Sequence, residues 1–287
     1  LKEFVPEAKI VHIDIDTASI SRNVLVDVPV VSDANLALDH LLVWARPLAC
    51  DSWRDRIGSW DREHPLKVAR REGKMSPQAV FASINTVFTE GIFVADVGQH
   101  QMWAYSYMTL NKDKRMFTSG GLGTMGFGFP AALGAKIACP DQNVVCLTGD
   151  GGFQMNMQEM ATAVLEDAPV TVCIFNNGYL GMVRQQQEYI YGKRYAIVNL
   201  NHRVHPKDDL LDADQGPYEP DFVKWAEAYG VDAVRVTGED EIIPALERAR
   251  KNQEAGKPML IEFMIAREYN ALPMVKGGRP MTDMILK

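Results

Sequence analysis

Short apolar runs alternate with stretches of helical spacing over most of this sequence. Continuous apolar runs are typical of strands buried in a parallel sheet, and apolar residues three and four positions apart predict amphipathic helices. Strands are expected at residues 8–16, 91–98, 143–151, 169–177, 232–238 and 258–266. Helices are expected at residues 33–45, 77–88, 129–138, 153–166, 221–230 and 239–252. This alternation predicts an α/β fold, a parallel β-sheet flanked by helices on both faces.

Two stretches interrupt the alternation. Residues 47–75 are charged and contain tryptophans, and we interpret them as a partly helical connector. It ends where Ser76 and Pro77 predict the start of a helix, as an N-cap followed by proline at the first helical position. Residues 185–220 are polar and rich in Asp, His and Pro. A long loop is expected there, and the sequence assigns no role to residues 196–219.

Composition excludes several classes of partner. The 287 residues are 47% hydrophobic, which is enough for one large domain or two smaller ones. The net charge of −7 argues against a nucleic-acid partner, because nucleic-acid binders present basic surfaces. No apolar run approaches the roughly 20 residues that cross a bilayer, so no membrane partner is expected. The four cysteines lack CxxC spacing and favour reduced thiols in a cytoplasmic protein.

Three predicted strands end in polar residues: at 97–100, 149–152 and 176–179. In parallel sheets of this class, ligands bind beyond the carboxyl ends of the strands. Gly151 and Gly152 lack Cβ atoms, so their backbone amides can approach an anion closely. Asp150 would repel a phosphate unless a cation lay between them, and Asn177 supplies a second oxygen. We therefore predict that Asp150 and Asn177 hold Mg²⁺, which lets an acidic protein bind a diphosphate.

An isolated Gly-Asp-Gly is more often a simple turn. The metal interpretation is stronger here because Asn176 and Asn177 follow at the end of the next predicted strand, with the spacing of the thiamine-diphosphate fingerprint.

A second glycine cluster, Gly121-x-Gly123-x-x-Gly126, has the letters of a dinucleotide fingerprint. The preceding stretch, residues 112–119, is not a convincing buried strand, so we reject a nicotinamide site. A glycine-packed helix entry and a cofactor-facing loop both remain. We favour the loop, because Met125 is a large apolar residue among small ones and offers a wedge for a bent cofactor.

Four motifs together resemble the large catalytic subunit of acetohydroxyacid synthase (acetolactate synthase), a thiamine-diphosphate enzyme family. These are DVGQHQMWA, TSGGLGTMGFGFPAALGAK, GDGGFQMNMQEMATA and NNGYLGMVRQ. Residues 8–23 resemble the end of that family's FAD-associated middle domain, and residues 271–286 resemble its C-terminal segment. The resemblance implies a remnant of the middle domain at 1–46, a connector at 47–75 and a thiamine-diphosphate-binding domain at 76–287.

The resemblance also implies roles for individual residues. Mg²⁺ would be bound by Asp150, the Asn177 side chain and the Tyr179 carbonyl. The diphosphate would be contacted by Gln99, His100, Gly151 and Gly152. The cofactor rings would be held by the Gly123 carbonyl, the Met125 amide and the Met125 side chain beneath the thiazolium. The reacting end would be approached by Met182 and Val183.

By resemblance, the enzyme would condense pyruvate with a second 2-keto acid to a 2-acetohydroxy acid, with loss of CO₂, in branched-chain amino acid biosynthesis. The family works as a homodimer, binds FAD in the full-length chain and is attended by a small regulatory subunit. Its catalytic glutamate lies in an N-terminal domain of a second catalytic subunit, and no segment here matches that domain. We therefore assign no catalytic residue to this chain and predict that it does not turn over pyruvate alone.

Two positions depart from the family's pattern. Gln186 stands where most members carry a tryptophan tied to preference for 2-ketobutyrate, which predicts poor discrimination between pyruvate and 2-ketobutyrate. Gly152 replaces the usual serine and removes one hydroxyl contact to the diphosphate. Two other functions remain open: a different thiamine-diphosphate carboligase or decarboxylase, and a non-catalytic module that keeps the cofactor site as scaffold.

Overall fold

The computed structural model describes residues 5, 7–66, 71–200 and 220–286. The chain divides into two compact units, one formed by Leu1–Pro65 with Leu272–Lys287 and the other by Leu66–Ala271. The domain boundaries expected from the sequence, after residues 46 and 75, stay a prediction.

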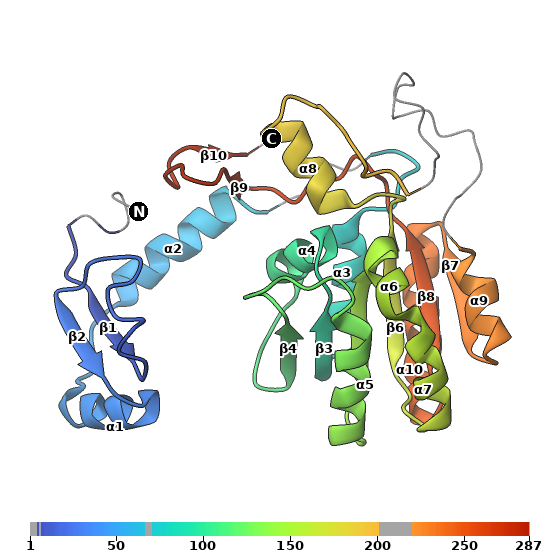
Figure 1. The fold of residues 1–287 in the computed structure, drawn as a ribbon, viewed down its shortest axis with the longest axis horizontal. Helices are drawn as coiled ribbons and strands as arrows, with labels where there is room; N and C mark the ends of the chain where they lie inside the picture. The colour runs from blue at the N-terminus through green and yellow to red at the C-terminus, as the bar shows by residue number, and fades with distance from the viewer. Residues whose placement is uncertain (1–4, 6, 67–70, 201–219, 287) are drawn as a thin grey trace. The chain divides into compact units, whose positions relative to one another are not determined.

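The larger unit is built on a six-stranded sheet in the order β4-β3-β5-β6-β8-β7 (Figure 1). All of its neighbouring strands are parallel. The strands are β3 (Gly91–Ala95), β4 (Lys114–Thr118), β5 (Val144–Gly149), β6 (Thr171–Asn176), β7 (Asp232–Val236) and β8 (Met259–Met264). The predicted parallel sheet is confirmed.

Helices cover both faces of this sheet. One face packs against α3 (Pro77–Val87), α4 (Gln99–Tyr107) and α10 (Ile242–Glu254). The other packs against α5 (Gly128–Ala138), α6 (Asp150–Asn156), α7 (Met160–Leu165) and α9 (Phe222–Ala228). Successive residues of a strand point to opposite faces, so Leu147 belongs to the first core and Cys146 to the second. Burial on both faces explains why the central strands are continuous apolar runs.

Local signals were confirmed at the start of α3. The Ser76 hydroxyl accepts a hydrogen bond from the Ala79 N–H at 3.1 Å, and Pro77 occupies the first turn. The helix expected at 153–166 forms in two parts, because a 3₁₀ turn at Met157–Glu159 separates α6 from α7.

Three elements of the larger unit differ from the sequence-based expectation, and one of them, α4, lies where no helix was expected. The stretch before the glycine cluster forms β4, an edge strand in which exposed residues alternate with buried or half-buried ones, so it is not buried throughout. Helix α8 (Gly181–Tyr189) occupies the start of the expected loop at 185–220. Most of its residues are good helix formers, but they form no apolar stripe that would predict a helix. Residues 201–219 of that loop lie outside the described residues.

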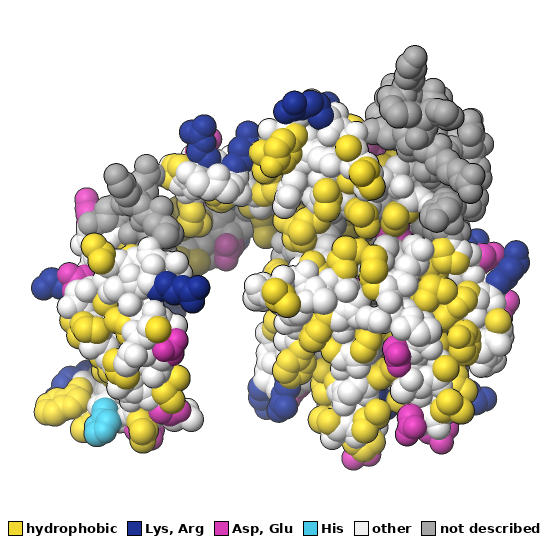
Figure 2. All heavy atoms as spheres, viewed as in Figure 1, with side chains coloured by type: hydrophobic (Ala, Val, Ile, Leu, Met, Phe, Trp, Pro, Cys, Tyr) yellow, Lys and Arg dark blue, Asp and Glu magenta, His cyan; other side chains and the backbone are white. Residues whose placement is uncertain are grey.

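The smaller unit contains a parallel pair, β1 (Val11–Asp14) and β2 (Val28–Val31), and helices α1 (Ala34–Trp44) and α2 (Asp51–Glu63). It also contains an antiparallel pair, β9 (Met274–Val275) and β10 (Met284–Ile285). Hydrophobic side chains gather on its surface (Figure 2), and in α1 only Ala37 is buried. Among the described residues of both units, no helix has the length and hydropathy needed to cross a membrane.

Candidate functional site

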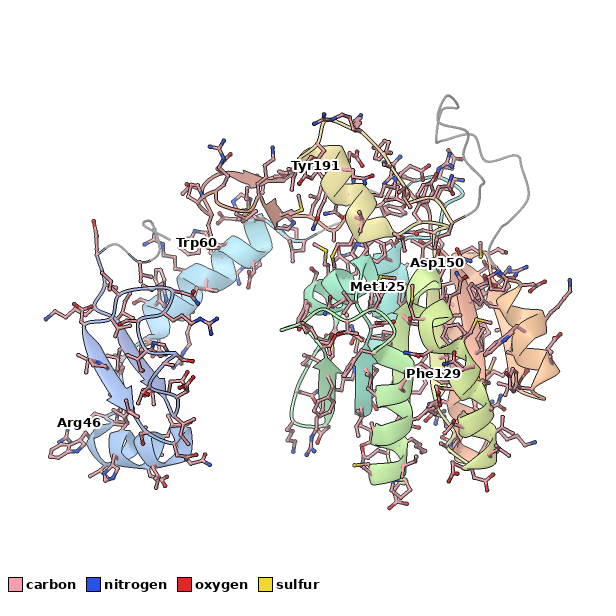
Figure 3. The ribbon with its side chains drawn as sticks, viewed as in Figure 1. Arg46, Trp60, Met125, Phe129, Asp150 and Tyr191 are labelled. Atoms are coloured by element: carbon pink, nitrogen blue, oxygen red, sulfur yellow. The ribbon has the colours of Figure 1, made fainter. Side chains whose placement is uncertain are left out.

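The carboxyl ends of β3, β5 and β6 meet at one edge of the sheet, because these strands are parallel neighbours. Asp150 follows β5 and Asn177 follows β6. The Asp150 Oδ2 atom accepts hydrogen bonds from the Asn177 N–H at 3.1 Å and the Gly178 N–H at 2.7 Å. The two predicted metal-binding residues are therefore adjacent. Figure 3 shows Met125 at the same end of the sheet as Asp150.

A cavity of about 240 Å³ opens at this edge. It is lined by every residue to which the sequence assigned the cofactor or the metal: Gln99, His100, Gly123, Met125, Asp150, Gly151, Gly152, Asn177, Tyr179, Met182 and Val183. Gln186, assigned to the substrate, is exposed on α8 and is not among the lining residues. The structure thus gathers the cofactor set in one place, while the role of each residue stays a prediction.

The oxygen atoms of Asp150 and Asn177 are fixed by local hydrogen bonds. Asp150 Oδ1 accepts from the Gly151 N–H at 2.7 Å, and Asn177 Oδ1 accepts from the Tyr179 N–H at 3.0 Å. Among the described residues, no group of three His, Cys, Asp or Glu side chains is placed to hold a metal. A few hard oxygens, completed by a carbonyl, phosphate and water, are the ligands that suit Mg²⁺.

His100 presents an unpartnered polar atom inside the cavity wall. Its Nε2 atom is buried without a hydrogen-bond partner among the described residues. Burial lowers the pKa of His100 to about 3, although a hydrogen bond to the Asp96 backbone raises it in part. The imidazole is therefore neutral. A diphosphate beside it would raise the pKa and let Nε2–H donate.

Two glycines make room for this imidazole. Gly98 has φ +154°, and a Cβ there would lie 2.7 Å from His100 Cε1. A Cβ at Gly149 would lie 3.0 Å from His100 Nδ1. Any side chain at either position would displace the ring, which explains the glycines on both strand ends.

Gly151 and Gly152 line the cavity with bare backbone. A Cβ at Gly151 would lie 2.8 Å from Leu180 Cδ2, and one at Gly152 would lie 2.5 Å from Asp96 Oδ2. These features fit a diphosphate and its divalent cation. The diphosphate can approach the bare backbone and the unpartnered His100 nitrogen, and the cation can bind the side-chain oxygens of Asp150 and Asn177.

Sequence reasoning missed Gln185, which is buried at the start of the expected loop. Its Oε1 atom accepts from Gln99 Nε2 and from the Ala271 N–H, each at 2.8 Å. Its Nε2 atom donates to the Ala271 carbonyl at 2.8 Å. No local pattern announces these contacts, because the partners lie 86 residues away along the chain.

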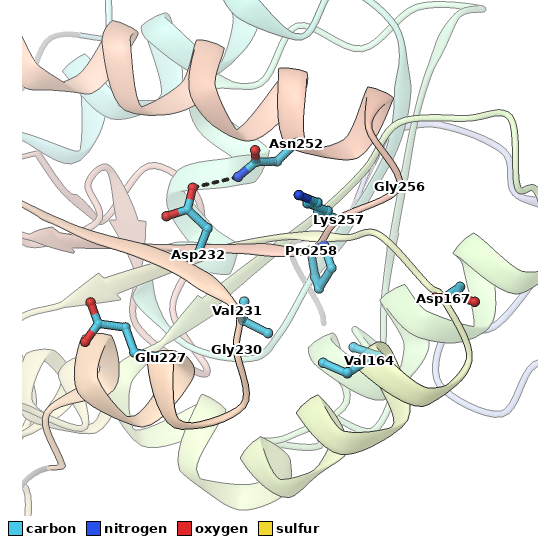
Figure 4. Close-up of a pocket in the computed structure, with 11 residues that line it drawn as sticks. Val164, Asp167, Glu227, Gly230, Val231, Asp232, Asn252, Gly256, Lys257 and Pro258 are labelled. Carbon is cyan, nitrogen blue, oxygen red and sulfur yellow. Dashed lines mark hydrogen bonds between the residues drawn. The ribbon is translucent and has the colours of Figure 1, made fainter.

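A larger cavity, of about 630 Å³, lies at the amino ends of β7 and β8 (Figure 4). Its lining includes Asp232, whose carboxylate accepts from Asn252 Nδ2 at 2.7 Å and is paired with Arg248. The side chains of Glu227 and Lys257 also line it but are exposed. This cavity lies at the opposite end of the strands from Asp150. Of the four motifs from the sequence, only GDGGFQMNMQEMATA reaches it, through its last residue, Ala163.

Residues 96–263 match a family model described as thiamine pyrophosphate enzyme, C-terminal TPP binding domain. The acetolactate synthase large subunit of Corynebacterium glutamicum is 38% identical over 288 residues, which cover 98% of this chain and 44% of the relative. The probable acetolactate synthase large subunit of Methanocaldococcus jannaschii is 40% identical over 297 residues, with 99% and 46% covered.

The chain spans less than half the length of these relatives. The matched region begins at Asp96 and ends at Phe263, so it contains the cavity with Asp150 and Asn177. The chain therefore belongs to the thiamine pyrophosphate (thiamine diphosphate) enzymes, and it contains their C-terminal cofactor-binding domain.

Proposed function

We propose that this chain forms the thiamine-diphosphate-binding part of an acetolactate synthase. The complete enzyme would condense pyruvate with a second 2-keto acid to a 2-acetohydroxy acid, with release of CO₂, as a transferase of branched-chain amino acid biosynthesis. The observation that carries the proposal is the contact between Asp150 and the Asn177 backbone, inside a cavity lined by the other assigned residues. The names of its relatives give the reaction.

Asp150, the Asn177 side chain and the Tyr179 carbonyl hold Mg²⁺ in this proposal. The diphosphate lies against the bare backbone of Gly151 and Gly152. His100 donates from Nε2 once the bound anion raises its pKa. The Gln99 side chain lines the cavity, but its amide group donates to Gln185 and to the Tyr269 carbonyl. It therefore supports the wall as well as facing the ligand.

The Gly123 carbonyl and the Met125 amide orient the aminopyrimidine ring, and the Met125 side chain fills the space beneath the thiazolium. Met182 and Val183, at the start of α8, border the reacting end. When bound, thiamine diphosphate supplies the carbanion that attacks the keto carbon and the electron sink for decarboxylation. The residues of this chain bind, orient and exclude water.

Turnover requires more than these residues. We infer that a second catalytic subunit supplies the glutamate that exchanges a proton with the cofactor, so that the enzyme acts as a homodimer with a small regulatory subunit. FAD would be bound by the complete protein, whose FAD-associated middle domain is represented in this chain by residues 1–46. The four cysteines are free thiols, two of them buried, which supports a cytoplasmic location.

Titration calorimetry with thiamine diphosphate tests the cofactor assignment. Binding with a Kd below about 1 mM is expected in the presence of Mg²⁺ and is lost when EDTA removes the metal. Asp150→Ala is expected to weaken binding at least about tenfold, because it deletes the charged metal ligand.

Asp141→Ala is the matched control, since Asp141 is exposed at the other end of β5. Binding that is unaffected by EDTA, or equally weakened in both variants, contradicts the proposed metal site.

A further inference from the structure

Asp96, the first residue of the motif DVGQHQMWA, is a buried acid beside the cofactor cavity, and neither the sequence analysis nor the proposed ligand set assigns it a role. It directly follows β3, and its side chain is almost fully buried. Its Oδ1 atom accepts from the Val97 N–H at 2.7 Å, and its Oδ2 atom accepts from the Thr148 hydroxyl at 3.1 Å. These two contacts fix the carboxylate against the ends of β3 and β5.

The same carboxylate reaches the loop that carries Met125. The Gly126 N–H lies 2.9 Å from Asp96 Oδ1 and 3.1 Å from Oδ2, so both oxygens share one backbone donor. The Gly126 carbonyl is held from the other side, where Asn156 Nδ2 donates to it at 2.9 Å. Gly126 has φ +88°, a backbone conformation that is unfavourable for residues with a Cβ atom.

Met125 therefore lies between two fixed peptide groups. On its amino side, the Thr124 N–H donates to the Ser119 hydroxyl at 2.9 Å. On its carboxyl side, Asp96 and Asn156 hold Gly126. From this position the Met125 side chain extends to Gly151, and its Cε atom lies 3.6 Å from a Cβ placed on that glycine.

Hydrogen bonds offset the burial of this carboxylate. Burial raises the pKa of Asp96, and the hydrogen bonds from Val97, Thr148, Gly126 and Gly128 lower it in part. A buried acid is unfavourable unless its oxygens are satisfied. The hydrogen bonds that satisfy this buried acid therefore join the Met125 loop to the ends of β3 and β5.

We propose that Asp96 is a positioning residue, whose carboxylate clamps the Gly126 amide and thereby holds Met125 in the cofactor cavity. The clamp rests on the proposed function only in its last step, where Met125 supports the bound cofactor. The link between Asp96 and Gly126 is a property of the chain itself and is tested without the cofactor.

Hydrogen exchange at the Gly126 amide of the 287-residue chain tests the clamp. Asp96→Ala is expected to speed this exchange by about 10-fold or more relative to the core amide of Val145, because a hydrogen bond to a charged group is lost. Asp96→Asn keeps an acceptor of the same shape without the charge, and an increase of about three- to tenfold is expected.

Thr148→Val is the matched control. It removes another donor to the Asp96 carboxylate and leaves the loop contacts in place, so exchange at Gly126 is expected to change by less than about threefold. Exchange at Gly126 within about twofold of the unmodified chain, in Asp96→Ala or in Asp96→Asn, overturns the clamp. Equal acceleration at Gly126 and Val145 also overturns it, since that is a global loss of stability. If Asp96→Ala does not fold, Asp96→Asn decides alone.

Calorimetry then tests the last step. Asp96→Ala is expected to weaken thiamine diphosphate binding with Mg²⁺ by about tenfold, and Thr148→Val to leave it within about threefold. Unchanged affinity with accelerated exchange overturns the positioning of Met125. If the unmodified chain does not bind the cofactor while hydrogen exchange follows the expected pattern, the proposed function fails. The clamp between Asp96 and Gly126 is then still supported.

Discussion

The Gln99 side-chain amide lies 2.8 Å from Gln185 Oε1, and this contact joins the cofactor cavity to helix α8. Gln99 also accepts from Asn177 Nδ2 at 3.2 Å, so a chain of amides connects a predicted metal ligand to the helix that carries Met182 and Val183. Glycine is required at position 181, beside these amide groups, because a Cβ on Gly181 would overlap Gln99 Oε1.

Replacing Gln185 with leucine tests how much these amide hydrogen bonds stabilise the protein. Gln185→Leu keeps a side chain of similar length but leaves the Ala271 peptide without its buried partner. It also removes one acceptor of the Gln99 amide group, which keeps the Tyr269 carbonyl. The free energy of unfolding is expected to fall by about 1–3 kcal/mol, as for other buried polar groups left unsatisfied. Urea unfolding measures the change.

Gln187→Leu is the control for this prediction. The Gln187 side chain donates to the Ala196 carbonyl and accepts from the Ala196 N–H, as Gln185 does with Ala271, but these hydrogen bonds are exposed. Water replaces those bonds, so a loss of about 0.5 kcal/mol or less is expected. Equal losses in both variants would show that burial of Gln185 is irrelevant.

His100 gives the stability a pH dependence. Its pKa is lowered to about 3 by burial, whereas the unfolded chain has the ordinary value near 6.5. The unfolded state therefore binds the extra proton first. The contribution of His100 to the free energy of unfolding is fully present above pH 6.5. It falls by about 1.4 kcal/mol per pH unit as the pH is lowered from 6.5 toward 3.

Urea unfolding of the cofactor-free chain between pH 7 and 5, compared with His100→Asn, measures this contribution. The difference between the two proteins isolates His100 from the other titrating groups. Parallel pH profiles would mean that His100 takes up its proton as readily in the folded chain as in the unfolded chain.

Gly152→Ser restores the residue usual in the family but places a Cβ 2.5 Å from Asp96 Oδ2 and 3.2 Å from Thr148 Oγ1. Because Asp96 is held by hydrogen bonds on several sides, we expect a loss of stability of about 1–3 kcal/mol. In an Asp96→Ala background the same substitution should cost at least about 1 kcal/mol less. A double-mutant cycle in urea shows whether the two sites are coupled, and additive losses would contradict the overlap.

Gln186→Trp tests the expected poor discrimination between second substrates. In the complete enzyme, an added apolar surface at this exposed position of α8 is expected to favour 2-ketobutyrate over pyruvate by about 1–3 kcal/mol. Competition between the two keto acids measures the ratio of products. Gln187→Trp, one residue further along the helix, should leave the ratio unchanged. Strong 2-ketobutyrate preference in the unmodified enzyme would refute the assignment of Gln186.

The sequence by itself predicted the parallel sheet and the place of the site. Strands β5 and β6 are buried on both faces, so they appear as apolar runs that end where Asp150 and Asn177 begin. Parallel topology then requires both ends to open on the same edge. The acid among glycines and the amide on the next strand, together with the spacing of the thiamine-diphosphate fingerprint, led to the prediction of the metal and the diphosphate.

Only the tertiary structure decided the elements that lack an apolar pattern. Strand β4 lies at the sheet edge and is partly exposed, and α8 is polar and is held by amide hydrogen bonds from Gln185. The Asp96 contact with Gly126 joins residues 30 positions apart. Hydrophobic periodicity records which face of an element is buried, but a single hydrogen bond between distant segments leaves no period in the sequence, so such contacts appear only once the chain has folded.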